Sequence, residues 1–225
     1  MPEDVRKITP RPAFDAIVAS MANCFVFDCD SVRRTLIDVV LMDVMNNDEF
    51  QNNVPMRCWG NISIGWQSKH AEFVGKVDYA IRCAPCWDNP PAQDIYLIPV
   101  QSKMGWYSSY INQAIAQGAT LQKKRKAVGK TAVVYIMLSD GFIWQFFNIG
   151  EDGHVQASRI MVMDLTSHPE DVEARQQVFT WIGHLMRQAR IVALADVATV
   201  NDNDEECDEG ETAHEDSDWD ENTFM

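Results

Sequence analysis

A carboxylate stands within one strand-like segment of the sequence, and an amide and a lysine stand at the end of the next. Asp78 lies in an alternating segment, and an apolar run at residues 95–100 ends in Gln101 and Lys103. Charged residues are rare in such segments unless they have a partner or a function. If the segments pair as a hairpin, Asp78 lies beside Gln101 and Lys103, which share one face because strand side chains repeat every two residues. These residues form a candidate catalytic cluster; the alternative is a salt-bridged aspartate and a lysine reaching from a strand end into solvent.

The order of the motifs around this cluster resembles that of the PD-(D/E)XK nuclease superfamily. Residues 75–78, GKVD, are similar to its G-x-x-D motif, and residues 95–103, IYLIPVQSK, are similar to its strand ending in (D/E)-x-K. Residues 133–147, VVYIMLSDGFIWQFF, look like the strand, DG turn and W-x-F hairpin of fungal and oomycete members. The resemblance covers about residues 30–190. It implies an α/β fold with a restriction-endonuclease-like αβββαβ core, in which helices flank a mixed central sheet.

The resemblance also implies metal-dependent hydrolysis of phosphodiester bonds in DNA or RNA. Asp78, Gln101 and Lys103 would be the catalytic residues. Asp78, Gln101 and the carbonyl oxygen of Ser102 would hold Mg²⁺ or Mn²⁺ through oxygen ligands. The metal would polarise the phosphate and help to form hydroxide from water, while Lys103 would orient that water or neutralise charge.

Gln101 departs from the family pattern, in which a carboxylate usually occupies this position. A glutamine offers a carbonyl oxygen but not the negative charge on which hard-cation sites depend. Another acid would have to compensate, and the candidates are Glu72, Asp43 and Glu49. The alternative is a protein of the same fold that cleaves weakly or not at all and serves as an interaction module for nucleic acid or protein.

A polar helix is expected after the third strand, and it supplies the candidate nucleic-acid contacts. Gln113 and Gln117 share one helix face at i and i+4, and the resemblance implies that this face points toward the substrate backbone. The basic cluster KKRKAVGK begins with Lys123, Lys124 and Arg125. It could bind phosphates in a salt-dependent way or act as a nuclear localisation signal. A solvated helix end, where cations are favourable, is the third interpretation.

The acidic charge of the chain is concentrated at its C-terminus. The net charge is −14, and twelve of the 33 acidic residues lie between Asp202 and Glu221, which leaves 21 acidic against 19 basic residues elsewhere. A segment so acidic and so poor in apolar residues is expected to be disordered. Such a tail could solvate the domain, compete with nucleic acid for a basic groove or bind a basic protein partner.

Composition and cysteine usage indicate an intracellular protein, in nucleus or cytoplasm, without a membrane span. Hydrophobic residues make up 46% of 225 residues, yet no apolar run approaches the ~18–20 residues needed to cross a bilayer. The start of the sequence, MPEDVRKITP, lacks the pattern of a signal peptide. The CAPC pair Cys83 and Cys86 offers two of the about four ligands of a zinc site. We therefore expect a hairpin loop with reduced thiols there rather than zinc.

The elements that must position the cluster can be placed from apolar periodicity and turn residues. We expect an N-terminal extension at 1–29, the nuclease-like domain at 30–200 and the acidic tail at 201–225. Asp30 or Ser31 is a candidate N-cap of the first helix of the domain, which ends at Asn46. Pro99 predicts a bulge or a strand end just before Gln101. The expected elements then follow in order: strands at 57–67, 71–83 and 94–103, a helix at 106–128, a hairpin at 131–150 turning at 140–141, a strand at 154–165 and a helix at 169–192.

Overall fold

The computed structural model of the protein describes residues 5–52, 55–67, 72–83, 98–103, 108–163 and 172–205. Its helices are α1 (Pro12–Cys24), α2 (Asp30–Met45), α3 (Asp48–Gln51), α4 (Ser108–Ala127) and α5 (Val172–Glu205). Its strands are β1 (Met56–Gln67), β2 (Glu72–Cys83), β3 (Ile98–Ser102), β4 (Val134–Ser139), β5 (Ile143–Ile149), β6 (Val155–Ala157) and β7 (Met161–Val162). The predicted order of a helix, three strands, a helix and a strand hairpin is confirmed from α2 to β5.

The described strands form one seven-stranded mixed sheet in the order β1-β2-β3-β4-β5-β6, with β7 also paired to β5. Neighbouring strands are antiparallel except β3 and β4, which are parallel. A parallel pair needs a long crossover connection, and α4 supplies it. Antiparallel β4 and β5 meet at the predicted turn, where Gly141 has a φ of 95° that favours glycine.

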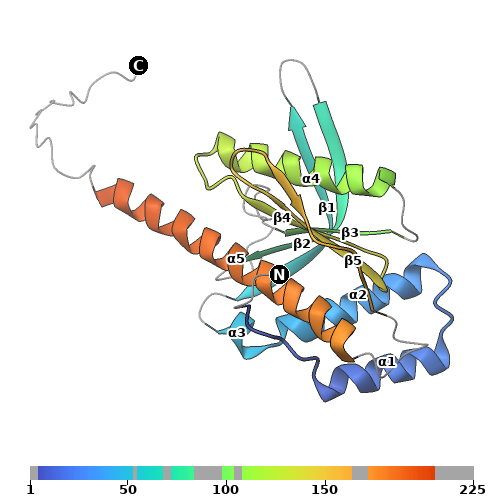
Figure 1. The fold of residues 1–225 in the computed structure, drawn as a ribbon. Helices are drawn as coiled ribbons and strands as arrows, with labels where there is room; N and C mark the ends of the chain where they lie inside the picture. The colour runs from blue at the N-terminus through green and yellow to red at the C-terminus, as the bar shows by residue number, and fades with distance from the viewer. Residues whose placement is uncertain are drawn as a thin grey trace, which may run out of the picture.

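Helices cover both faces of the sheet, which gives a three-layer α/β arrangement (Figure 1). On one face, α4 packs through Ala114 and Leu121 against Val134 and Ile136. On the other face, α1, α2 and α5 build the larger core; its buried members on α2 include Leu36, Ile37, Val40, Leu41 and Val44. These positions follow the 3.6-residue helical repeat, so the predicted amphipathic helix buries its apolar stripe on the sheet.

The N-terminal segment is part of the domain and not an extension to it. Phe14 of α1 packs edge-on against Phe179 of α5, with ring centroids 4.9 Å apart. The backbone N–H of Ile8 donates to the hydroxyl of Thr180 at 3.1 Å. The sequence places apolar residues in this segment, but only the position of α5 shows what they cover.

The long C-terminal helix extends further than predicted. α5 ends at Glu205 rather than near residue 192, so the first residues of the expected tail continue the helix. The acidic segment from residue 206 onward lies outside the described residues. None of the helices in the described ranges is long and apolar enough to cross a bilayer.

Two strand predictions differ from the structure. β3 continues through Pro99 and Gln101 to Ser102, so the predicted break before Gln101 is wrong; Pro99 still pairs in register with Ala80. The strand expected at 154–165 is divided into β6 and β7. Between them, the N–H of Ser158 donates to the carbonyl oxygen of Phe146, and the Ser158 hydroxyl accepts from the Phe146 N–H at 3.1 Å.

Gly118 allows α4 to approach the sheet closely. A Cβ atom added to Gly118 would lie 2.8 Å from Cγ1 of Ile136 and 3.1 Å from Cδ1 of Ile149. Both distances are shorter than an ordinary contact between carbon atoms. The neighbouring side chain, Gln117, is thereby brought against the sheet.

We predict that Gly118→Ala destabilises the protein despite the higher helix propensity of alanine. Overpacking should lower the free energy of unfolding by about 1–3 kcal/mol, and replacing a helical glycine by alanine should raise it by about 1 kcal/mol. The net loss, about 1 kcal/mol, can be measured by urea unfolding. Ile136→Val in the same chain removes Cδ1, the Ile136 atom closest to the added Cβ, and should relieve part of the clash, so the two changes together should destabilise by less than their sum. A Gly118→Ala variant more stable than wild type would contradict this account of the packing.

Candidate functional site

The site begins where the pairing of β2 with β3 ends. Their last registered pair is Tyr79 with Val100. One residue further along this antiparallel register, Asp78 lies opposite Gln101. On the other side of β2, the pairing with β1 passes from Gly60 with Tyr79 to Ile62 with Val77. Asn61 between them has a left-handed φ of 54°, which is uncommon for a residue other than glycine.

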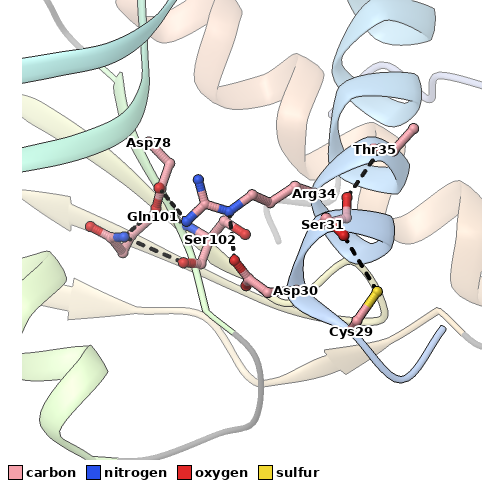
Figure 2. A network of polar contacts seen from close by, with 8 residues as sticks. All are labelled: Cys29, Asp30, Ser31, Arg34, Thr35, Asp78, Gln101 and Ser102. Atoms are coloured by element: carbon pink, nitrogen blue, oxygen red, sulfur yellow. Dashed lines mark hydrogen bonds and ion pairs between the residues drawn. The ribbon is translucent and has the colours of Figure 1, made fainter.

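Nitrogen donors from two elements surround the carboxylate of Asp78. Oδ2 accepts from the backbone N–H of Ser102 at 2.8 Å and from the side-chain amide of Gln101. Oδ1 forms an ion pair with Nη2 of Arg34 at 2.9 Å. Figure 2 shows these contacts converging from α2 and β3 onto Asp78. Asp78 is therefore in direct contact with Gln101 and Ser102 of the neighbouring strand.

The direction of the Gln101 amide follows from a chain of hydrogen bonds. Nε2 of Gln117, on α4, donates to the backbone carbonyl of Lys76 at 2.8 Å and to Oε1 of Gln101 at 2.7 Å. Because the carbonyl oxygen of Gln101 is used by Gln117, its NH₂ group is left to donate to Asp78. Gln101 and Gln117 are only 2% and 1% exposed. A neutral glutamine is therefore the residue type that satisfies both neighbours.

Arg34 brings a second carboxylate to the site. Its Nε lies 2.8 Å from Oδ2 of Asp30, four residues earlier in α2, while its Nη2 contacts Asp78. Burial acts to lower the pKa of Arg34, but the charges of Asp78 and Asp30 outweigh burial and raise it. Asp30 was predicted as a helix cap, yet the N-cap is Cys29 and no side chain caps the helix. The i,i+4 spacing of Asp30 and Arg34 was the sequence signal for their pair.

Lys103 is anchored near the site by its backbone and by an aromatic ring. Its N–H donates to the carbonyl of Ser139 at 2.9 Å. Its Nζ lies 5.8 Å from the ring centroid of Tyr110 in the first turns of α4, within the range of a cation–π interaction. The ammonium group is therefore directed to the α4 side of the sheet, the side that Gln101 also faces.

Two of the predicted nucleic-acid contacts are buried. Gln117 is occupied by Lys76 and Gln101, as described above. Arg125 is 1% exposed, pairs with Asp196 at 2.6 Å and donates from Nε to the carbonyl of Thr131. Neither can reach a nucleic acid, because helix periodicity turns these positions toward the sheet and α5. The remaining candidates are on the surface: Lys123 is exposed, and Gln113 and Lys124 are half-buried.

The acids expected to compensate for Gln101 have other roles. Asp43 pairs with Arg11 at 2.7 Å, and Glu49 pairs with Arg187 at 2.6 Å. Glu72 is exposed at the start of β2, about six residues and 20 Å along the strand from Asp78. The prediction that one of these acids joins the site is therefore wrong, and Asp30 is the acid that does.

The site as folded does not fit a divalent cation. One oxygen of Asp78 takes two N–H donors and the other takes a guanidinium, and the nitrogen of Gln101, not its oxygen, faces that carboxylate. Within the part of the chain that the structure describes, no group of three or more His, Cys, Asp or Glu side chains could hold a metal ion. Of the CAPC pair, Cys86 lies outside the described residues. The site is a cluster of two carboxylates, one guanidinium and amide donors.

Comparison with known proteins gives no further assignment. A scan against family models and searches of curated proteins and of solved structures found no significant match to the chain. The structure establishes an α/β class with helices on both faces of a mixed sheet. Because such folds host many activities, function has to be inferred from the Asp78 cluster and the surface around it.

We predict that Gln101→Glu destabilises the protein in a pH-dependent way. The new carboxyl would be buried beside Asp78, and both factors would raise its pKa above that of an unfolded glutamate. Its ionised form is then disfavoured in the folded state, so stability should fall as pH rises through the raised pKa. Urea unfolding should show a loss of about 3 kcal/mol at pH 8 and a smaller loss at pH 5.

Gln101→Met is the matched control for this variant. It removes the same hydrogen bonds without adding a charge, so its loss of stability should vary little between pH 5 and 8. A Gln101→Glu protein as stable as wild type at pH 8 without divalent cations would show that residue 101 does not face Asp78.

Proposed function

We propose that the protein is a PD-(D/E)XK-like α/β domain that binds nucleic acid without using a metal ion to cleave it. The observation that carries the proposal is the occupation of both Asp78 oxygens by Arg34, Gln101 and Ser102. Arg34 supplies positive charge at the position where the resemblance would place a metal. It cannot lower the pKa of a bound water as a coordinated metal does.

The order and pairing of the elements support the resemblance. Helix α2, strands β1 to β3, helix α4 and strand β4 follow one another as in an αβββαβ core. Asp78, within β2, and Gln101, near the end of β3, meet where the pairing of the two strands ends, as the G-x-x-D and Q-x-K motifs require. These agreements concern topology and position; they support the fold assignment but do not by themselves support catalysis.

The surface over α4 supports nucleic acid as the partner. α4 carries no acidic residue, and Lys123 and Lys126 near its end are exposed. Lys103 and Tyr110 lie at its beginning, about 20 Å away at a rise of 1.5 Å per residue. A phosphate backbone lying along the helix would meet cations at both ends, and Tyr110 could stack on a base. The β1–β2 hairpin extends beyond α4 on this side (Figure 1).

Metal-dependent cleavage of nucleic acid is the second candidate. The observation in its favour is that Asp78, Gln101 and Ser102 do meet, with Lys103 next in the chain. Mg²⁺ or Mn²⁺ would have to displace Arg34 from Asp78, and the amide of Gln101 would have to turn its oxygen toward the ion. The two candidates differ in one property, which is whether adding a divalent cation produces cleavage.

The full-length protein should bind labelled DNA or RNA oligonucleotides with an affinity that falls as salt rises, because phosphate contacts release counterions. Fluorescence anisotropy measures this binding. Lys123→Glu with Lys126→Glu should weaken it roughly tenfold. Lys7→Glu is the matched control, because Lys7 is exposed on the N-terminal segment outside α4, and it should leave affinity unchanged.

The same preparations, incubated with Mg²⁺ or Mn²⁺, should leave single-stranded and duplex DNA and RNA intact. Cleavage that requires the cation and is abolished by Asp78→Asn would establish the second candidate instead. An absence of binding to every oligonucleotide at low salt would contradict the proposed partner.

A further inference from the structure

We infer that the guanidinium of Arg34 is the resident cation of a two-carboxylate site, and that this site binds a hard divalent cation when Arg34 is removed. The two acids come from different elements, Asp30 from α2 and Asp78 from β2. The inference concerns cation binding and does not depend on nucleic-acid binding. Its failure and that of the proposed function would therefore be separate results.

The guanidinium of Arg34 contacts both carboxylates. Asp30 accepts a hydrogen bond from Nε at 2.8 Å, and Oδ1 of Asp78 forms an ion pair with Nη2 at 2.9 Å. These two nitrogens form one edge of the planar guanidinium group, with their N–H bonds directed the same way. Both acids therefore surround one cationic group, the position that a single Mg²⁺ or Mn²⁺ ion with oxygen ligands would take if the guanidinium were absent. Figure 2 shows Arg34 reaching from α2 to both acids.

The charge balance explains why a cation is needed at this point. Asp78 is only 11% exposed, and like charges brought together disfavour the ionised form of both. Arg34 offsets this repulsion, so the cluster of Asp30, Asp78 and Arg34 carries one net negative charge. Without Arg34 it would carry two, in a partly desolvated setting where electrostatic attraction for a divalent cation is strong.

Ser102 supplies a second, independent indication of a cation ligand. Its backbone N–H donates to Asp78. Its Oγ atom is buried, in a residue that is 1% exposed, and has no hydrogen-bond partner among the residues that the structure describes. Side chains alternate along a strand. Gln101 faces α4, so the Ser102 hydroxyl faces the α2 side, where Arg34 lies. A buried hydroxyl without a partner is costly, and it offers a neutral oxygen ligand on the side of the sheet from which Arg34 reaches Asp78.

Arg11, at the N-cap of α1, provides a comparison, because its partner Asp43 lies on α2 as Asp30 does. Its Nε pairs with Oδ1 of Asp43 at 2.7 Å, and its backbone N–H donates to the other oxygen of the same carboxylate. That arginine is held by one acid. Removing it would leave a single carboxylate, which is a poor site for a hard cation. Arg11→Ala is therefore a matched control for Arg34→Ala.

Arg34→Ala should gain a site for Mn²⁺, a probe whose free concentration is read directly by electron paramagnetic resonance. We expect the variant to bind at least about tenfold more tightly than wild type, in the weak range of about 10⁻⁴–10⁻³ M typical of sites with few acids. Mn²⁺ or Mg²⁺ should also raise the Tm of the variant, which is lowered by the uncompensated pair of acids, and leave the Tm of wild type unchanged. Arg34→Gln, which keeps a hydrogen-bond donor, should behave similarly if Arg34→Ala is poorly folded.

The controls make the assignment specific. Arg11→Ala should show no gain of Mn²⁺ binding, and Arg34→Ala combined with Asp78→Asn or with Asp30→Asn should lose the gain. The inference is overturned if neither Arg34→Ala nor Arg34→Gln binds Mn²⁺ more tightly than wild type, both as purified and after refolding in the presence of Mn²⁺. It is also overturned if the Asp78→Asn combination still binds.

Discussion

The negative charge of the Asp78 carboxylate has to be balanced by a cation and hydrogen-bond donors around it, and all three layers of the fold contribute to that balance. Arg34 reaches it from α2, the N–H of Ser102 from β3, and the amide of Gln101 links it to Gln117 on α4. An uncompensated charge at so low an exposure would cost several kcal/mol. Two backbone features allow these contacts: α4 approaches the sheet closely at Gly118, and the pairing of β2 with β3 ends next to Asp78.

The polarity of the network explains why residue 101 is a glutamine and not a carboxylate. A carboxylate at residue 101 would need a cation between itself and Asp78, whereas the glutamine donates to Asp78 directly. Arg34 then satisfies the remaining oxygen of Asp78 together with Asp30. Under the proposed function, glutamine and arginine take the place of the acids and metal of a nuclease site. The site then keeps its charge balance without a metal ion that could activate water.

The distribution of charge gives this protein two unlike surfaces. The acids of the described domain lie mainly outside α4, and much of the net charge of −14 belongs to the C-terminal residues. α4 carries only cations, of which Arg125 is used internally by Asp196. A low isoelectric point of the whole chain is therefore compatible with a basic face, because potentials act locally over about a Debye length.

The sequence by itself determined the order of the elements, the two neighbouring strands that carry Asp78 and Gln101, and the neutral side chain at residue 101. These are local properties, set by apolar periodicity and by turn residues such as Gly141. Only the tertiary structure decided which acid joins Asp78, because Asp30 lies 48 positions away and is brought there by the packing of α2 on the sheet. The tertiary structure also decided that Gln117 and Arg125 face inward, because packing determines which face of α4 is buried. Sequence spacing defines faces and registers, but which face meets which partner depends on the assembled layers.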